Sequence, residues 1–496
     1  MDTDEDMRTS NLNMLFNPRS VAIVGASASP GKLGTITLLS TIAGGFKGKI
    51  HPINPNEDEI LGLKTYSSVK DVPDEIDIAV ICTPSISVSK IVEECIKVGV
   101  KFGVVLSAGF GELGEDGKKA EKKMAEVARG EKMRLIGPNC MGMGSAASKL
   151  YASLNFTIPK PGNASIVSQS GTLATFITIE ASRQGVGINK YVSSGNEADL
   201  HMEDFLSYYA DDPETKVVAA FIEGVRDGRR FMDVSKRITK NKPFIVIKGG
   251  TTEIGAAAAS SHTGSLSGSN YVFDAVCRQA GIIRVSNYME MIDLLRAFSF
   301  SSLPKGRNVG MVSSQGGMGV LAADACVKYG LNLPKLTKGS MNELNSFLPY
   351  MWSHKNPIDI TGGTMDPTAF TRSLEVLLQQ RDIQSVLCLA PIYSSYFDTV
   401  RAQISNDMRD ISELIPAEMI EAVDEAAVDD LVKLKKKYNK PIVGIGFLSR
   451  RESNAVKLLQ DNGILIYETP DQAAYVLSKL ADYNEYQKGC SIWQSS

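Results

Sequence analysis

The sequence predicts an α/β protein whose parallel sheets are covered by helices on both faces. Short apolar segments of strand length alternate with helical segments, and the strands are apolar along nearly their whole length. Strands of this kind, separated by helices, are typical of doubly wound sheets in which both faces are buried. With 496 residues the chain is long enough for several such cores, and three domains are expected.

The first domain is expected over residues 13–147. Its strands are predicted at Ser20–Val24, Lys49–Ile53, Ile76–Thr83, Phe102–Ala108 and Met133–Ile136. Helical patterns such as Val88–Val98 and Lys118–Arg129 lie between them. Ligands of a doubly wound sheet bind at the carboxyl ends of its strands. Residues 1–12 and 483–496 are expected to form disordered tails.

Two further domains, residues 148–300 and 301–482, share one plan. Ala164–Gly185 and Asn308–Gly330 each contain a strand ending in Val-Ser, then a polar glycine turn, then a helix closed by glycine. The last domain is longer, with an acidic helical insertion around Glu413–Lys437. We infer two flavodoxin-like domains related by duplication, although two unrelated α/β domains would show much of the same pattern.

Composition argues against several classes of protein. A net charge of −3 without a basic stripe argues against nucleic acid as a partner. No apolar segment reaches the roughly 18 residues of a membrane helix, and the acidic N-terminus differs from a signal peptide, so a cytoplasmic protein is expected. The seven cysteines form no CxxC pair and no zinc-type spacing with histidine, so no metal site is predicted.

The first glycine loop, Gly25–Gly34 (GASASPGKLG), follows a predicted strand and precedes a helix. Its glycine spacing, with Leu33 in place of Ser or Thr, disfavours a P-loop, and it lacks the GxGxxG pattern of dinucleotide sites. Backbone amides and Lys32 at a helix N-terminus remain, and they suit the phosphates of an adenine-containing ligand. The alternative is a tight strand–helix turn with a surface lysine.

One of only four histidines, His262, lies in the small-residue segment Ala256–Ser269 (AAAASSHTGSLSGS). Packing does not require an imidazole among such small residues, and a loop of this composition lets bulky ligands approach its reactive side chain. We interpret His262 as a carrier of phosphate. A capping or turn histidine is the alternative.

A carboxylate is predicted to support this histidine. Glu223 follows the predicted strand Val217–Ile222, so it lies where sites form in open sheets. There it could bind one imidazole nitrogen of His262 and fix the tautomer that leaves the other nucleophilic. Pairing with Arg226 or Arg229 as surface ions is equally consistent with the spacing.

Two further turns, SQSGTL and SSQGGMG, place small polar residues where a helix is predicted to begin. One such turn is usually only a capped helix, but two beside a phosphate-carrying histidine suggest a shared anion cradle. The predicted phosphate-binding residues are Ser168, Ser170, Gly171 and Thr172 in the first turn, and Gln315, Gly316 and Gly317 in the second.

Together, GASASPGKLG, SQSGTL, SSGNEADL, IEGVRDGRRF and SSHTGSLSG closely resemble motifs of the α subunits of ADP-forming acyl-CoA synthetases, relatives of succinyl-CoA synthetase. The resemblance extends from about Asn13 to Asp482. It implies a Rossmann-like CoA-binding domain followed by two flavodoxin-like domains. It also implies interconversion of acyl-CoA, phosphate and ADP with a carboxylic acid, CoA and ATP, through an acyl phosphate and a phosphohistidine.

By the same resemblance, His262 matches the phosphorylated histidine and Glu223 the glutamate that supports it. The CoA-binding stretches then contain Gly25, Ser27, Pro30, Lys32, Gly34, Asn54, Pro55, Cys82, Thr83, Pro84 and Asn139. ADP or ATP with Mg²⁺ is expected on a separate ATP-grasp β subunit, in an α₂β₂ assembly. A non-catalytic CoA-binding scaffold protein of the same fold is the alternative.

Overall fold

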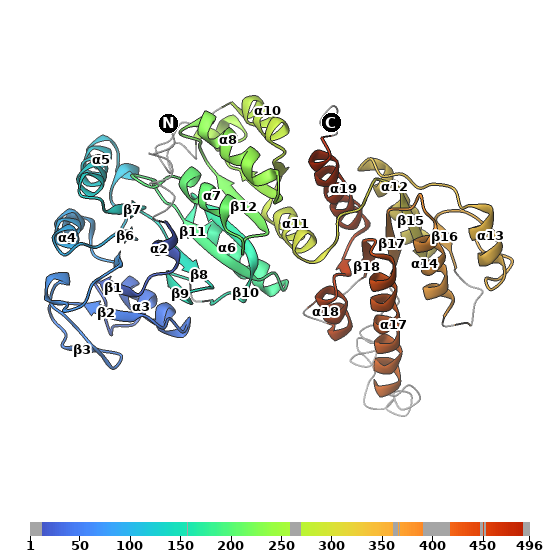
Figure 1. Cartoon of the computed structure of the whole chain (residues 1–496), viewed down its shortest axis with the longest axis horizontal. Helices are drawn as coiled ribbons and strands as arrows, with labels where there is room; N and C mark the ends of the chain where they lie inside the picture. The colour runs from blue at the N-terminus through green and yellow to red at the C-terminus, as the bar shows by residue number, and fades with distance from the viewer. Residues whose placement is uncertain are drawn as a thin grey trace. The chain divides into compact units, whose positions relative to one another are not determined.

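The computed structural model describes residues 12–155, 157–257, 269–360, 366, 368–389, 417–446, 450 and 453–489 (Figure 1). The chain divides into two compact units, Met1–Leu295 and Arg296–Ser496. His262 lies outside the described residues, as do most residues of the two expected tails.

The first unit begins with a parallel sheet in the strand order β2-β1-β5-β6-β7. Its strands are β1 (Ser20–Val24), β2 (Lys49–Ile53), β5 (Ile78–Ile81), β6 (Phe102–Val105) and β7 (Arg134–Ile136). The helices of this part are α2 (Leu12–Phe16), α3 (Leu33–Ala43), α4 (Ser85–Lys97) and α5 (Glu115–Gly130). All five predicted strands are confirmed, and a small hairpin that was not predicted, β3 (Glu59–Ile60) with β4 (Leu63–Lys64), is added.

A second sheet in the same unit has the order β14-β13-β12-β10-β11-β8-β9. Its strands are β8 (Gly142–Ser145), β9 (Leu150–Ser153), β10 (Pro161–Ser168), β11 (Ile188–Ser193), β12 (Val217–Ile222), β13 (Phe244–Lys248) and β14 (Ile283–Val285). Helices α6 (Gly171–Arg183), α7 (Met202–Asp211), α8 (Gly228–Thr239), α10 (Asn270–Ala280) and α11 (Tyr288–Phe300) accompany them. Strands β8 and β9 pair antiparallel at one edge. Although β8 precedes residue 147, where the first domain was expected to end, it belongs to this second sheet.

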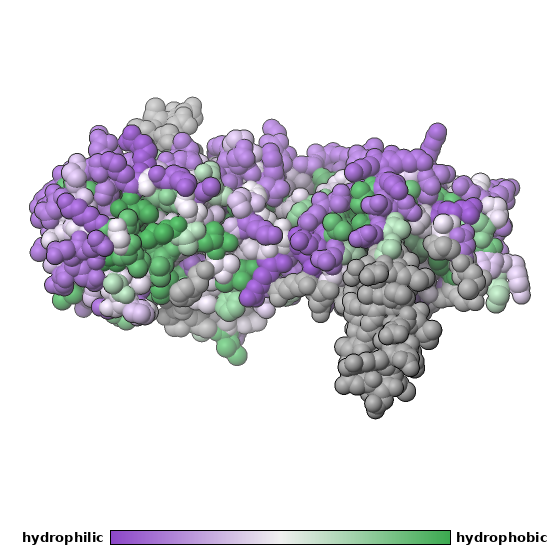
Figure 2. All heavy atoms as spheres, turned by 90° about the horizontal axis from the view of Figure 1, so that it is seen from below, coloured by the Kyte–Doolittle hydropathy of each residue, from purple (hydrophilic) through white to green (hydrophobic). Residues whose placement is uncertain are grey.

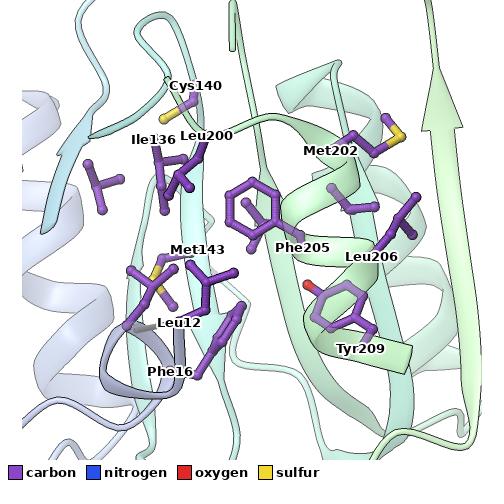
Figure 3. Packing of buried hydrophobic residues seen from close by; sticks show 14 of the residues in the cluster. Leu12, Phe16, Ile136, Cys140, Met143, Leu200, Met202, Phe205, Leu206 and Tyr209 are labelled. Atoms are coloured by element: carbon purple, nitrogen blue, oxygen red, sulfur yellow. The ribbon is translucent and has the colours of Figure 1, made fainter. Parts of the chain in front are cut away.

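A common apolar core holds the two sheets of the first unit together. Buried residues of both, together with Phe16 of α2, form one cluster. Figure 3 shows Phe16, Ile136, Phe205 and Tyr209 in this packing. A buried carboxylate adds a polar link, because Asp199 binds Arg129 and Arg134 of the first sheet region and accepts from the backbone amide of Leu135. The first two expected domains therefore fold as one body.

The second unit contains a third parallel sheet with the order β16-β15-β17-β18-β19. Its strands are β15 (Val309–Ser313), β16 (Ile358–Asp359), β17 (Ser385–Leu389), β18 (Ile442–Ile445) and β19 (Leu465–Tyr467). Its helices are α12 (Gly316–Lys328), α13 (Lys338–Asn345), α14 (Ala369–Gln379), α17 (Ala417–Tyr438), α18 (Asn454–Asp461) and α19 (Pro470–Gln487). Helix α19 continues past residue 483, where a tail was expected, because Tyr483 is buried against Phe298.

The three sheets repeat one strand order. When the parallel strands of each sheet are counted along the chain, all three have the order 2-1-3-4-5. In such a sheet the connections leave in opposite directions after the first and third strands, and the carboxyl ends of these two strands border the ligand site. The three switch points lie between β1 and β5, between β10 and β12, and between β15 and β17.

The surface drawn in Figure 2 mixes hydrophilic and apolar areas, with apolar residues gathered on part of the first unit. In the described part of the chain, no helix combines the length and the apolar character that crossing a membrane requires.

Candidate functional site

At the first switch point, the loop after β1 lies against the loop after β5. Gly25 has a φ of 87°, and a Cβ there would lie 3.0 Å from Thr83 Cγ2. A Cβ on Gly34 would lie 1.9 Å from the carbonyl oxygen of Gly25, so helix α3 starts directly against the end of β1. Only glycine permits both approaches, and they leave the backbone amides of the turn at the carboxyl edge of the sheet.

The predicted CoA-binding residues in these loops divide into exposed residues and residues that hold the loop. Exposed residues are Pro30, Lys32, Pro55 and Pro84. Ser27 is only 3% exposed, and its hydroxyl accepts a hydrogen bond from Ser29 N at 3.0 Å. Asn54 Nδ2 donates to Ala26 O at 2.8 Å. Ser27 and Asn54 therefore shape the loop, whereas the exposed residues are accessible to a ligand.

Two further predicted CoA residues have defined chemical environments. Burial raises the pKa of the Cys82 thiol to about 12, and its Sγ lies 3.7 Å from Thr37 Oγ1. Cys82 therefore stays a neutral thiol near neutral pH and is not a nucleophile. Asn139 has a φ of 56° and donates from Nδ2 to Asn196 Oδ1 at 3.3 Å. Asn139 thus connects the first sheet region to a loop of the second sheet.

The second switch point brings Gln169, which follows β10, against Glu223, which follows β12. Gln169 Oε1 accepts hydrogen bonds from Glu223 N at 2.6 Å and Gly224 N at 3.0 Å. Gln169 Nε2 donates to Gly224 O at 2.9 Å. Glu223 is 7% exposed and lies at the carboxyl end of its strand, as predicted. Three hydrogen bonds from one side chain fix the backbone that carries this carboxylate.

The segment that carries His262 leaves the sheet beside Glu223. Strand β13 ends at Lys248, whose Nζ donates to Glu223 O at 2.7 Å. Burial lowers the pKa of Lys248, and Arg284 lowers it further while Glu223 opposes the shift. A Cβ on Gly249 would lie 3.6 Å from Glu223 Cγ. The chain therefore starts toward residue 262 next to the predicted supporting carboxylate, although the contact between Glu223 and His262 stays a prediction.

A second buried carboxylate, Glu197, lies behind Gln169. Its Oε2 accepts from Gln169 Nε2 at 3.1 Å, and its Oε1 accepts from Ser194 Oγ at 2.7 Å and Met202 N at 3.2 Å. Burial raises the pKa of Glu197 to about 7 and repulsion from Glu203 adds to the shift, whereas the donated hydrogen bonds and Arg226 oppose it. Glu197 is thus a carboxylate near this turn whose protonation changes around neutral pH.

The sequence left open that Glu223 pairs with Arg226 or Arg229 rather than with His262, and the structure gives the contacts of Arg226. Arg226 Nη2 donates to Asn196 O at 2.6 Å, and its Nε lies 3.8 Å from Glu197 Oε2. The Arg226 guanidinium is therefore engaged by the loop that contains Glu197. The role of Arg229 as a partner of Glu223 stays untested.

The two predicted phosphate turns both begin a helix. Ser168 Oγ donates to Ser170 O at 2.6 Å, and Ser170 caps helix α6 by accepting from Leu173 N. In the other unit, Ser313 Oγ donates to Gln315 O at 2.7 Å, just before helix α12. Each turn lies at the positive end of a helix dipole, where the first backbone amides of the helix have no partner within the helix, and this suits an anion. A cradle shared by the two turns stays a prediction.

Sequence reasoning missed Gln169 and Glu197 as individual site residues, although both lie in motifs that it singled out. The available signal was position, because Gln169 directly follows a strand at a switch point. Within the described residues, no group of three or more His, Cys, Asp or Glu side chains is arranged so that it could hold a metal ion.

Family models match three successive parts of the chain. Residues 19–146 match a CoA binding domain, residues 161–298 a succinyl-CoA ligase like flavodoxin domain, and residues 309–432 a ligase-CoA domain. These matches follow the order of the three sheets.

Similar proteins cover nearly the whole chain. The α subunit of acetate–CoA ligase (ADP-forming) II from Pyrococcus furiosus is 38% identical over 475 residues, which are 95% of this chain and 98% of that one. An ADP-forming acetate–CoA ligase from Methanocaldococcus jannaschii is 43% identical over 355 residues, which are 72% of this chain but 50% of that protein. A solved structure of the dinucleotide forming acetyl-coenzyme A synthetase 1 from Ca. Korarchaeum cryptofilum, in complex with phosphate and ADP, has a TM-score of 0.83 and 33% identity, and the match covers 98% of this chain and 99% of that one.

Proposed function

The chain belongs to the ADP-forming acyl-CoA synthetases, as a relative of their α subunits, and we propose that it carries the phosphoryl group of the reaction on His262. The observation that carries this proposal is the position of Glu223. It lies at the second switch point, beside helix α6 and beside the start of the segment that contains His262.

In the first step, a phosphate oxygen attacks the thioester carbonyl carbon of acyl-CoA. The C–S bond breaks, CoA leaves as the thiol after taking a proton, and an acyl phosphate remains. The amides at the start of helix α6, with Ser168, Ser170, Gly171 and Thr172, would hold the phosphate. Gly316 and Gly317 would supply a second set of amides at the start of helix α12, where Gln315 N donates to Ser313 Oγ at 3.0 Å and leaves the Gln315 side chain as the group that could reach the phosphate.

In the second step, an imidazole nitrogen of His262 attacks phosphorus. The P–O bond to the acyl group breaks and the carboxylate leaves. Glu223 would accept a hydrogen bond from the other imidazole nitrogen, which fixes the tautomer and stabilises the positive charge that develops on the ring. A terminal oxygen of ADP then attacks the phosphohistidine, so that ATP forms and the imidazole is regenerated. The reverse direction makes the thioester.

CoA would bind at the first switch point. The loop amides between Gly25 and Gly34 suit its phosphates, and Lys32 is exposed at the start of helix α3 to pair with their charge. The loops after β2, β5 and β7, which contain Pro55, Pro84 and Asn139, border the same edge of the sheet.

Half of the Methanocaldococcus relative lies outside its match to this chain. A separate subunit that supplies the missing part would therefore complete this enzyme, and we propose an ATP-grasp β subunit that holds ADP or ATP with Mg²⁺, in an α₂β₂ assembly. Acetate is the first acid to test, because the matched relatives are named for it. A cytoplasmic location stays a prediction.

The decisive experiment mixes the chain with its ATP-grasp subunit and γ-³²P-labelled ATP. We expect an acid-labile, alkali-stable label on this chain, and His262→Asn should abolish both the label and acyl-CoA formation. Turnover retained by His262→Asn would refute the assignment of this histidine. A non-catalytic CoA-binding scaffold would instead bind CoA and take no label in the wild-type chain.

A further inference from the structure

The loop Ser194–Leu200, here called the 194–200 loop, contacts both the first sheet region, which carries the predicted CoA-binding loops, and the turn before helix α6. At one end Asn196 Nδ2 donates to the carboxylates of Glu112 at 2.7 Å and Glu121 at 2.9 Å, which belong to the first sheet region. At the other end Glu197 accepts from Gln169. The Glu197 side chain therefore contacts the predicted phosphate-binding turn at Ser168–Thr172 through Gln169. None of the three catalytic steps uses Glu197.

We propose that Glu197 is a positioning residue for phosphoryl transfer, because it orients the Gln169 amide that holds the backbone of Glu223. This inference rests on the proposed roles of Glu223 and His262. It adds a residue that acts only through Gln169 and touches no substrate.

The chemistry of the contact fixes the direction of the Gln169 amide. An ionised carboxylate only accepts hydrogen bonds, so the end of Gln169 that faces Glu197 must be its NH₂ group. The carbonyl oxygen then faces the other way, where the backbone amides of Glu223 and Gly224 donate to it. A reversed amide would place NH₂ against two N–H donors and lose those hydrogen bonds.

The position of Glu197 is itself costly, which argues for a specific role. The residue has a φ of 56°, a left-handed conformation that is unfavourable for a side chain of this kind. It is 2% exposed, and Ser194 and Met202 hold its second oxygen. A buried carboxylate in a strained backbone is retained only where the surroundings specify it.

Protonation of Glu197 would weaken its hold on the orientation of the Gln169 amide. The charged groups that act on it are Glu203 of helix α7 and Arg226 of the loop after β12, and the neutral donors are Ser194, Gln169 and the backbone amide of Met202. A protonated carboxyl group can donate as well as accept, so it no longer dictates which end of the Gln169 amide faces it. The rate of phosphoryl transfer should therefore fall as the pH is lowered through the range near neutrality.

The test uses the full chain and ³²P-labelled acetyl phosphate, so that neither nucleotide nor partner subunit is needed. The P–O bond of acetyl phosphate breaks, acetate leaves, and a P–N bond forms on His262. Glu197→Gln should slow labelling about 10- to 100-fold, the range seen when a residue that orients a metal ligand through a hydrogen bond is lost. The concentration of acetyl phosphate that gives half-maximal rate should change little, and the pH dependence near neutrality should disappear.

Glu121→Gln is the matched control, since Glu121 is a buried carboxylate on the other side of Asn196 and does not contact Gln169. It should keep the wild-type rate and pH profile. Gln169→Ala removes the clamp without altering a buried charge and should show the same loss as Glu197→Gln. The double variant should be no slower than Gln169→Ala alone, because both changes break one chain of contacts.

A wild-type rate and pH profile in Glu197→Gln would overturn the inference, as would losses that multiply in the double variant. If Glu197→Gln does not fold, a wild-type rate in Gln169→Ala has the same consequence. Failure of the proposed function has a different signature, in which the wild-type chain takes no label or His262→Asn takes as much as the wild type.

Discussion

The turns that precede helices α6 and α12 are built in the same way but have different neighbours. In each, a buried serine at the end of a strand donates to a carbonyl two residues ahead, at 2.6 Å for Ser168 and 2.7 Å for Ser313. The neighbouring strand then places Ser193 opposite Ser168, and Asp359 opposite Ser313. One helix start therefore has a hydroxyl beside it and the other has a carboxylate.

This difference shows that the two turns share a shape but not an electrostatic environment. A Cβ on Gly316 would lie 3.2 Å from Asp359 Oδ2, so a carboxylate already lies at the start of helix α12. At the start of helix α6, the nearby carboxylates are those of Glu223 and Glu197, and Gln169 links their positions. The repeated strand order gives both turns the same shape. The charges near each turn come from residues outside it, and these residues differ.

The largest difference between the two turns is expected from a substitution of Glu223, which follows the third parallel strand of its sheet. Glu223→Gln keeps the size of the side chain but removes the charge that stabilises the imidazolium. We expect labelling of His262 by acetyl phosphate to slow by about 10²–10⁴-fold. The rate is measured by quenching at timed intervals. A loss of less than about threefold would show that the turn before helix α6 works without this carboxylate.

Glu197, near the turn before helix α6, should make the free energy of unfolding depend on pH. Its pKa in the folded chain is raised to about 7, so folding favours the protonated form. The stabilising contribution is complete below the unfolded pKa and is lost as the pH rises through about 7. The free energy of unfolding should therefore fall by roughly 2 kcal/mol more in the wild type than in Glu197→Gln between about pH 5 and pH 7.

Urea titrations followed by circular dichroism measure this difference. Because other groups titrate in both proteins, only the difference between wild type and variant is informative. Identical pH dependence in the two would mean that Glu197 is charged throughout this range.

Two matched glycines test how tightly each turn is packed. A methyl group on Gly171 would meet Met141 Cγ at 2.2 Å, whereas among the described residues one on Gly316 would meet Asp359 Oδ2 alone, at 3.2 Å. Gly171→Ala should cost about 1–2 kcal/mol, at the lower end for overpacking because methionine is flexible. Gly316→Ala should stay within about 0.5 kcal/mol of the wild type.

For Gly316→Ala the fluorescence of Trp352, which is buried in the second unit, reports unfolding directly. Circular dichroism serves for Gly171→Ala. Equal costs in the two variants would contradict the difference in packing that separates the turns.

The smallest effects should come from the serines that the turns share. Ser168→Ala and Ser313→Ala each remove one buried hydroxyl that donates to a carbonyl. Each should cost about 0.5–1 kcal/mol of unfolding free energy, measured by urea titration. Unequal costs would show that the two turns are less alike than their hydrogen bonds indicate.

Much of the fold was predictable because its strands are buried on both faces. Ser20–Val24, Lys49–Ile53 and Val217–Ile222 are strands with the predicted bounds. The first and the last are continuous apolar segments that both faces of a sheet can bury, whereas Lys49–Ile53 (KIHPI) is an edge strand with an exposed start. The strand Gly142–Ser145 (GMGS), which lies between β11 and the edge strand β9, was missed because it has no continuous run of apolar residues. The strand order of each sheet could not be predicted from the sequence, because the spacing of strands along the chain does not determine which of them are neighbours.

The site was predictable only to the level of strand ends. The position of Glu223 followed from the carboxyl end of its strand, but its support did not. Gln169 lies 28 residues from Glu197 and 54 from Glu223 along the chain, so their contacts arise only from strand order and side-chain orientation. The roles of His262, of the CoA loops and of a shared phosphate cradle stay predictions that the experiments above address.

The carboxylate of Asp199, held by two arginines, sets a rule for building hybrid enzymes. Arg129 and Arg134 come from the first sheet region and Asp199 from the second, so a swap of either region alone takes the partners of a buried carboxylate from two different proteins. Recombination with relatives should therefore exchange residues 12–295 as a single block. A breakpoint near residue 147 would separate these partners and should give insoluble protein.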